Sequence, residues 1–186
     1  MKVYLAGPDV SLPDAIDIGR AKVELCAAYG LTGLFPLDNQ IDRDRTDASL
    51  QIFRGNEAMM NTADAIIANL TPFRGPGADA GTVYELGYMA ARGKLCLGYS
   101  NDPRFYAERV AHMAELKSGN GLLTDPDGLT VENFDLADNL MMIHALDLHG
   151  SPLITPATAP ANLWRDLACF EACVRLAAGR IAPAAV

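Results

Sequence analysis

The sequence predicts an α/β protein in which one parallel sheet is covered by helices on both faces. Short apolar runs alternate along the chain with longer segments whose apolar residues recur at helical spacing, and this alternation is typical of parallel sheets. The length of 186 residues suits one domain with a sizeable core, because most single domains hold ~100–200 residues. No internal repeat or long linker divides the chain, so we expect residues 1–186 to form a single domain.

Apolar runs with the length of buried strands occur throughout the first half of the chain. They lie at residues 2–6, 31–35, 65–70 and 95–99. The first run ends at the turn-forming pair Gly7-Pro8, and the second leads into a polar loop at residues 36–44. The third leads into residues 71–78, which are rich in glycine and proline and therefore predict a loop at one edge of the sheet.

Longer segments have the apolar spacing or the end signals of helices. They lie at residues 13–29, 48–62, 81–92, 103–116, 138–149 and 161–178. Gly30, Gly93 and Gly150 follow three of them, as is common at helix ends, and Asp138 is of a type favoured as an N-cap. The last segment is expected to close the fold. The glycine-rich and polar residues 117–130 predict a surface loop.

The composition argues against several classes of partner. A formal charge of −8 disfavours nucleic acid, which requires a basic face. No apolar run approaches the ~20 residues of a membrane span, and the first strand follows Met1 directly, so we expect no secretory signal and no membrane partner. The cysteines occupy apolar faces of predicted elements, at Cys26, Cys96, Cys169 and Cys173. Reduced buried thiols, no metal site and a cytoplasmic location are therefore expected.

Residues 79–87 carry the strongest functional signal and have the sequence Asp-Ala-Gly-Thr-Val-Tyr-Glu-Leu-Gly. Asp79 is expected on the loop after the third strand, and Glu85, six residues later, in the first turns of the next helix. Open α/β sheets bind ligands at the carboxyl ends of their strands, and free N–H groups at a helix start favour a nearby anion. Acidic residues at a helix start also occur without a function, where they contribute about a few tenths of a kcal/mol.

Motifs along the chain resemble those of the nucleoside 2-deoxyribosyltransferases. They are Tyr-Leu-Ala-Gly-Pro at 4–8, Pro-Leu-Asp-Asn-Gln at 36–40, Ala-Asp-Ala-Ile-Ile-Ala-Asn-Leu at 63–70, the run at 79–87 and Asp-Asn-Leu-Met at 138–141. The resemblance covers residues 2–146 and keeps the family's order. It implies a doubly wound, flavodoxin-like sheet and an enzyme of nucleotide salvage. That enzyme would exchange the base of a 2′-deoxynucleoside with retention at the anomeric carbon, without a metal or other cofactor.

The resemblance also implies catalytic roles for individual residues. Glu85 matches the nucleophile, which must attack C1′ through an oxocarbenium-like transition state and hold a glycosyl ester. Tyr4 matches the residue whose hydroxyl steadies that carboxylate. Asp64 matches an acid on the base side of the pocket, which would supply a proton as the base leaves.

Substrate-binding roles follow from the same resemblance. Asp79, together with Asn139 from a neighbouring subunit, would hold the 5′-hydroxyl of the sugar, so a homo-oligomer is expected. Met141 would pack close to the sugar and Gln40 would contact the base. Two further residues are expected near the substrate, Gly7 in the turn after the first strand and Phe73 in the loop before Asp79. The partners would be a 2′-deoxynucleoside and a free nucleobase.

Most of these residues also have a purely structural interpretation. Tyr4 could be a core aromatic residue, Asp64 a residue of a helix-to-strand turn, and Asn139 a helix cap. Gln40 lies in a polar loop, where solvent exposure is common. Phe73 could equally be an exposed residue of a lid.

Two other functions stay open at this point. A 2′-deoxynucleoside 5′-monophosphate N-glycosidase would share the residues around Glu85 but would cradle a phosphate after the first strand. Here residues 7–14 contain two aspartates and two prolines, which make a poor phosphate nest, although Arg43, Arg45 and Arg74 could supply charge. A non-catalytic nucleoside-binding domain is the other alternative. The accepted bases, the balance of transfer and hydrolysis, and the oligomer size are not predicted.

Overall fold

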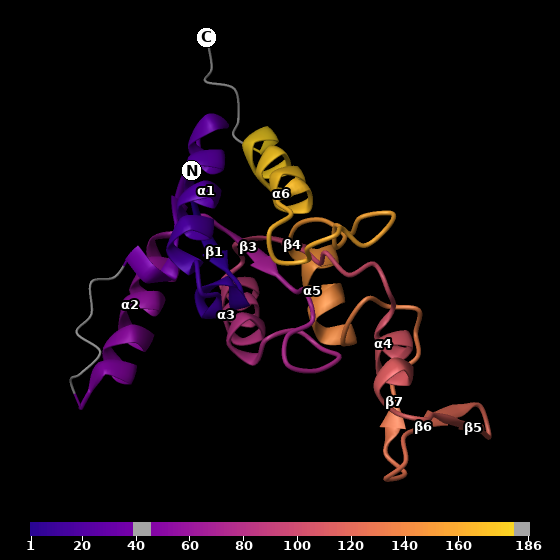
Figure 1. The fold of residues 1–186 in the computed structure, drawn as a ribbon. Coiled ribbons are helices and arrows are strands. Elements are labelled where there is room, and N and C mark those ends of the chain that lie inside the picture. Colours follow the sequence, from indigo (N-terminus) through magenta and orange to yellow (C-terminus); the bar gives the residue numbers. More distant parts are fainter. Residues whose placement is uncertain (39–45, 181–186) are drawn as a thin grey trace.

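A computed structural model describes residues 1–38 and 46–180 and contains a central parallel sheet (Figure 1). Its strands are β1 (Lys2–Ala6), β2 (Thr32–Leu34), β3 (Ala65–Asn69) and β4 (Leu95–Tyr99). They are arranged in the order β2-β1-β3-β4, and every neighbouring pair is parallel. The predicted α/β class and the predicted strands are confirmed.

The strand order places a topological switch between β1 and β3. The chain moves outward from β1 to β2 and then returns past β1 to pair β3, with Tyr4 opposite Ile66. Open α/β sheets form a crevice at such a point, beyond the carboxyl ends of the two strands. The loops that leave β1 and β3 therefore frame the expected ligand site.

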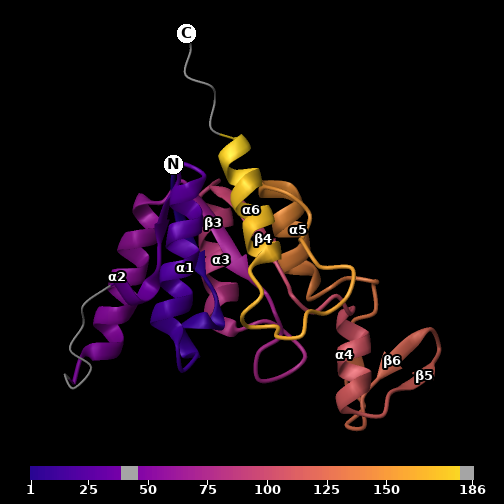
Figure 2. The ribbon, with the colours of Figure 1, turned by 45° about the horizontal axis from the view of Figure 1, so that its top comes forward.

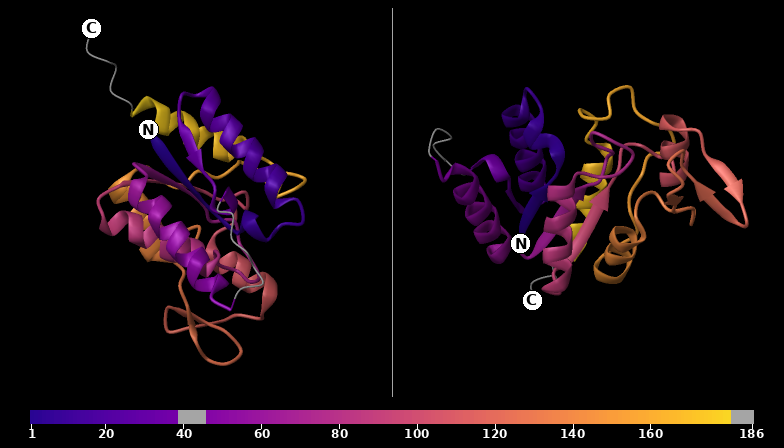
Figure 3. Two further views of the ribbon diagram at one scale, coloured as in Figure 1. Left: turned by 90° about the vertical axis from the view of Figure 1, so that its left-hand side faces the viewer. Right: turned by 90° about the horizontal axis from the view of Figure 1, so that it is seen from below.

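Helices cover both faces of the sheet, as the sequence predicts (Figures 2 and 3). One face packs against α1 (Ala15–Ala28) and α6 (Ala168–Gly179), and the other against α2 (Ala48–Thr62), α3 (Ala80–Ala91) and α5 (Leu140–His149). Because side chains alternate along a strand, Val3 and Leu5 of β1 enter the first layer. Tyr4 and Ala6 enter the second layer. This alternation aims Tyr4 at α3.

The predicted loop at residues 117–130 is wrong. This region forms a small antiparallel sheet of β5 (Lys117–Gly119), β6 (Leu122–Thr124) and β7 (Thr130–Val131). Asn120 and Gly121 join β5 to β6 with φ angles of 52° and 76°. A two-residue Asn-Gly connection with both φ angles positive is a strong hairpin signal. The sheet lies beside α4 (Tyr106–Met113), away from the central strands (Figures 1 and 2).

Two predicted helices are shorter in the structure than expected. Residues 103–116 contain only α4, and α6 begins at Ala168 rather than near residue 161. The segment before α6 is irregular, and the Asn101 side chain donates to its carbonyls of Leu163 and Asp166.

The chain after α5 lies against the edge of the sheet. Gly150 and Ile154 form parallel bridges with Cys96 and Tyr99 of β4. A side chain at position 150 would meet the Cys96 carbonyl oxygen at 1.7 Å, so this close approach requires glycine. Gly150 therefore both ends α5 and lets the backbone reach β4.

The cysteines are buried, as expected, at Cys26, Cys96, Cys169 and Cys173. Across the described ranges, no helix combines the length and the hydrophobicity that a membrane-spanning segment requires.

Candidate active site

A hydrogen bond between Tyr4 and Glu85 forms the centre of the site. The Tyr4 hydroxyl donates to Glu85 Oε1 at 2.6 Å, although the two residues are 81 positions apart in sequence. Tyr4 is 0% exposed on β1. Glu85 extends from the second turn of α3, beside the buried residues Leu86 and Met89 that fix this helix on the sheet. The fold therefore brings together Glu85, which matches the family's nucleophile, and Tyr4, which matches the residue whose hydroxyl steadies that carboxylate.

The surroundings of Glu85 shift its ionisation towards neutral pH. The pKa of its carboxyl is raised from 4.5 to about 7, chiefly by burial and also by the nearby negative charge of Asp79. Hydrogen bonds from Tyr4 and Asn56 act in the opposite direction, because they stabilise the ionised form. Burial and the same carboxylate raise the pKa of Tyr4 well above 10.0. Tyr4 therefore remains a neutral donor throughout the physiological range.

An open pocket of about 290 Å³ lies between α2 and α3 and reaches Glu85. Its lining consists of Phe53, Asn56, Met60, Gly81, Tyr84 and Glu85. Phe53 and Tyr84 are 45% and 52% exposed, and their ring centroids lie 6.2 Å apart. A pocket with an aromatic rim and a carboxylate at its floor suits a flat ligand with an electrophilic centre.

The α2 side of this pocket was not predicted from the sequence. Phe53, Asn56 and Met60 follow one another at intervals of three and four residues, so they share one face of α2. Such spacing is usually taken for a core-facing stripe. Asn56 within an otherwise apolar face is the one sign that could have identified it, and its position beside Glu85 depends on the packing of α2 next to α3.

Asp79 lies at the beginning of α3 as its N-cap. Its Oδ2 accepts from Thr82 N at 2.9 Å and from Thr82 Oγ1 at 3.1 Å. This cap fixes the start of the helix that carries Glu85. The side chain is half-buried and is close enough to influence the pKa of Glu85, so Asp79 and Glu85 belong to one site.

The structure does not bring Asp64 to this site. Asp64 is exposed at the amino end of β3, where its Oδ2 accepts from Lys2 N at 2.8 Å. Asp64 is also absent from the lining of the pocket that reaches Glu85. The expectation that Asp64 lies on the base side of the pocket is therefore wrong, and its role as a turn residue is correct.

Gly7 and Phe73 have structural explanations of their own. A side chain at position 7 would meet Asp9 Oδ2 at 2.4 Å and Asn69 Cβ at 2.8 Å, so packing alone requires glycine there. The rings of Phe73 and Trp164 meet edge to face with their centroids 6.1 Å apart. The Arg74 guanidinium carbon lies 4.6 Å from the centre of the Phe73 ring. Gln40, Arg43 and Arg45 lie outside the described residues.

Asn139 and Met141 lie at the start of α5 and do not line the pocket of their own chain. Asn139 is the N-cap, accepting from Met141 N at 3.0 Å and donating through Nδ2 to Glu132 Oε1 at 2.8 Å. Met141 is 72% exposed. Asp138, expected as the cap, instead pairs with Arg109 at 3.1 Å. Supply of Asn139 to a neighbouring subunit stays a prediction.

Within residues 1–38 and 46–180, no group of three or more histidine, cysteine or acidic side chains is arranged to hold a metal ion.

The fold and the site together define a doubly wound α/β protein whose carboxylate-centred pocket lies beside the switch point of the sheet. The sequence model of one family, described as nucleoside 2-deoxyribosyltransferase, matches residues 3–141. The chain belongs to the nucleoside 2-deoxyribosyltransferase family, as the motifs over residues 2–146 indicate.

Individual relatives extend this assignment. The chain is 31% identical to a 2-desoxiribosyltransferase from Leishmania mexicana, with a TM-score of 0.68, over 97% of this chain and 99% of the other. An uncharacterised protein of Schizosaccharomyces pombe is 36% identical in an alignment of 155 residues that covers 75% of this chain and 74% of that protein. A conserved protein from Enterococcus faecalis shares the fold at 19% identity, with a TM-score of 0.58 over 94% and 97% of the two chains.

Proposed function

We propose that this protein transfers the 2-deoxyribosyl group between nucleobases of 2′-deoxynucleosides, with a slower side hydrolysis. The observation that carries the proposal is the carboxylate of Glu85, held by the buried Tyr4 hydroxyl at 2.6 Å and open to a pocket large enough for a base. The family and the Leishmania mexicana relative support this class of reaction.

The reaction would proceed as a double displacement on Glu85. One carboxylate oxygen forms a bond to C1′ while the C1′–N bond breaks and its electron pair leaves with the base, which takes up a proton. A second base then attacks C1′ through a ring nitrogen that gives its proton to solvent, while the C1′–O bond breaks and its electron pair returns to Glu85, so the configuration is retained. Water competes in this second step and yields free deoxyribose. Tyr4 remains protonated and orients the carboxylate in both steps.

Asn56 takes the place on the base side that the sequence suggested for Asp64. Its amide hydrogen bonds to Glu85 and lines the pocket. An amide does not donate a proton as an acid at neutral pH, so Asn56 would orient the carboxylate and the base while the leaving base takes its proton from solvent. Phe53 and Tyr84, at the rim, would stack against the base.

The other end of the substrate would be an uncharged 5′-hydroxyl held by Asp79. In the loop after β1, Asp9 is 2% exposed and turns inward. It pairs with Lys22 Nζ at 2.6 Å and accepts from Asn69 Nδ2 at 3.2 Å. The Lys22 cation is thus already neutralised, and Pro8 has no N–H to offer. These features disfavour a phosphate group at this loop.

A homo-oligomer would complete the site, with Asn139 and Met141 of one subunit beside the sugar in the next. Both residues lie at the surface end of α5, outside their own chain's pocket. An exposed methionine is suited to apolar contact with a sugar ring. A non-catalytic nucleoside-binding domain is disfavoured, because a binder has no need of a partly buried nucleophile.

Incubation with deoxyinosine, with and without adenine, tests the proposal. Chromatography should resolve deoxyadenosine and hypoxanthine when adenine is present, with no metal or nucleotide added. Glu85→Gln, which keeps the shape of the side chain, should form neither. Release of only base and deoxyribose under both conditions would make the enzyme a hydrolase. Deoxyinosine monophosphate as the better donor would identify a nucleotide N-glycosidase instead.

A further inference from the structure

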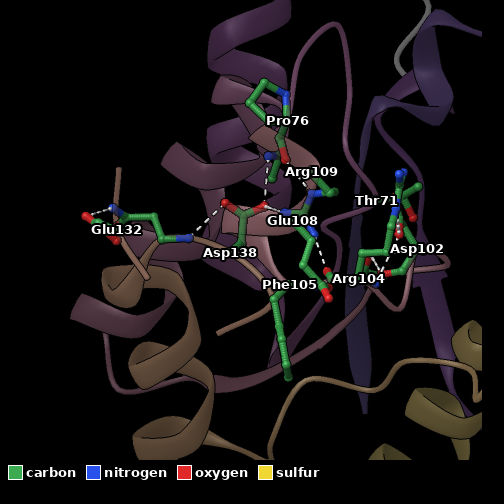
Figure 4. A network of polar contacts seen from close by, with 12 residues as sticks. Thr71, Pro76, Asp102, Arg104, Phe105, Glu108, Arg109, Glu132 and Asp138 are labelled. Carbon is green, nitrogen blue, oxygen red and sulfur yellow. Dashed lines mark hydrogen bonds and ion pairs between the residues drawn. The ribbon is translucent and has the colours of Figure 1, made fainter. Parts of the chain in front are cut away.

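Outside the pocket, a buried ion pair joins segments that are far apart in sequence (Figure 4). Asp138 Oδ2 and Arg109 Nη2 lie 3.1 Å apart, and both side chains are 3% exposed. Arg109 also donates through Nε to the Pro76 carbonyl at 2.6 Å and through Nη1 to the Arg104 carbonyl at 2.7 Å. The pair therefore connects the loop before α3, the residues before α4 and the start of α5.

The Asp138 carboxylate reaches the backbone next to both candidate sugar-binding residues. Its Oδ2 accepts from Ala78 N at 3.0 Å, and its Oδ1 accepts from Asn139 N at 2.8 Å. Ala78 directly precedes Asp79. One side chain thus holds the chain on the amino side of Asp79 and at Asn139 itself.

We propose that Asp138 and Arg109 are positioning residues that set Asp79 and Asn139 for the 5′-hydroxyl of the sugar. The inference rests on the proposed function and extends it to residues that touch neither the pocket nor the substrate. If Asn139 serves a neighbouring subunit, the Asp138 carboxylate positions Asp79 in its own subunit's site and Asn139 in the adjacent site.

The charge of Asp138 is needed because its two oxygens accept from different donors. Oδ2 serves Ala78 N and Arg109 Nη2, while Oδ1 serves Asn139 N. In Asp138→Asn one of these positions becomes an amide NH₂, which cannot accept a hydrogen bond. Either the Ala78 side or the Asn139 side must then move, although the shape of the side chain is unchanged.

Two donors that differ only at the 5′ position separate positioning from general damage. The readout is the ratio of kcat/KM for 2′-deoxyinosine to kcat/KM for 2′,5′-dideoxyinosine, measured on one preparation. This ratio does not depend on the fraction of folded protein. Asp138→Asn should lower the ratio by roughly tenfold, the effect of one misplaced hydrogen bond to a charged group. General damage would lower both rate constants and leave the ratio unchanged.

Matched variants complete the experiment. Asp79→Ala should lower the ratio at least as much as Asp138→Asn. Arg109→Lys keeps the positive charge but loses the planar guanidinium that donates to the carbonyls of both Pro76 and Arg104. This variant should lower the ratio less than Asp138→Asn does. Glu171→Gln removes a carboxylate on the opposite face of the sheet, in α6, where Glu171 Oε1 accepts from the Tyr29 hydroxyl at 2.5 Å, and should leave the ratio unchanged.

An unchanged ratio in Asp138→Asn and Arg109→Lys, with a lowered ratio in Asp79→Ala, would overturn the inference and leave the proposed function standing. If either variant loses all activity, the other decides by the same ratio. Absence of base exchange in the unmodified protein would instead refute the proposed function.

Discussion

Replacing Glu85 by glutamine should stabilise the protein above pH 7 while removing its turnover. The side chain of Glu85→Gln has the same shape as the protonated carboxyl and accepts the Tyr4 hydrogen bond, so the two proteins should be about equally stable in acid. The difference arises only when the native carboxyl ionises in its partly buried position.

The magnitude follows from the pKa of Glu85. Burial raises this pKa from 4.5 to about 7, and one pKa unit corresponds to ~1.36 kcal/mol. Because the folded pKa lies above the unfolded value, the stabilising contribution is fully present below pH 4.5 and is lost as the pH rises to 7. Partial solvent access makes about 3 kcal/mol an upper value for the loss.

Urea unfolding of both proteins between pH 4.5 and 8.5 measures this effect. Ionisable groups remote from Glu85 contribute equally to the two curves, so the difference between the two unfolding free energies reports Glu85 together with its coupling to Asp79. We expect this difference to grow steadily with pH and to level off above pH 7. Parallel curves would refute the reasoning, since they would mean that Glu85 ionises in the folded protein as it does in solvent.

The remaining predictions concern catalysis at the same site. Tyr4→Phe should lower kcat/KM by roughly tenfold or more, the effect of a lost hydrogen bond to a charged group. It should also move the acid limb of the pH–rate profile upward, because the hydroxyl lowers the pKa of Glu85; an unmoved limb would contradict this account. Asn56→Ala should lower kcat/KM, whereas Asp64→Asn should leave it within about twofold, as expected for a surface residue; the reverse result would return Asp64 to the site. When Glu85→Ala and Asn139→Ala subunits of a two-fold dimer are mixed, random pairing makes half the dimers hybrid, and each hybrid has one intact site and one site with both changes. About a quarter of all sites are then intact, so activity should rise to about a quarter of the wild-type level per site. No regain, with hybrids confirmed by mass, would place Asn139 outside a shared site.

Local signals in the sequence predicted most elements of this fold. The strands β1 and β3 are apolar runs whose residues are almost all buried, and the glycines after α1, α3 and α5 mark their ends. The hairpin from β5 to β6 was also local, since Asn120 and Gly121 form its turn. The glycine and polar content of residues 117–130 by itself predicts a loop and hides this turn signal.

The late start of α6 was not a local signal. The irregular segment before this helix is bound by the Asn101 side chain, which lies 62 residues before Leu163 in the chain. The Arg109–Asp138 pair likewise spans 29 residues, and neither residue type identifies the other in the sequence.

The sequence by itself determined the α/β class through its alternating strands and helices, and its motifs indicated the family and, through that resemblance, the pairing of Tyr4 with Glu85. In the structure the pair forms because strand alternation and helix phase direct both side chains to the same face of the sheet. Only the tertiary structure decided which polar residue faces Glu85 from α2. Asp64 and Asn56 are eight residues apart, and both are plausible partners by type. The packing of α2 against α3 places Asn56 in the pocket, while the direction of β3 leaves Asp64 at the opposite edge of the sheet.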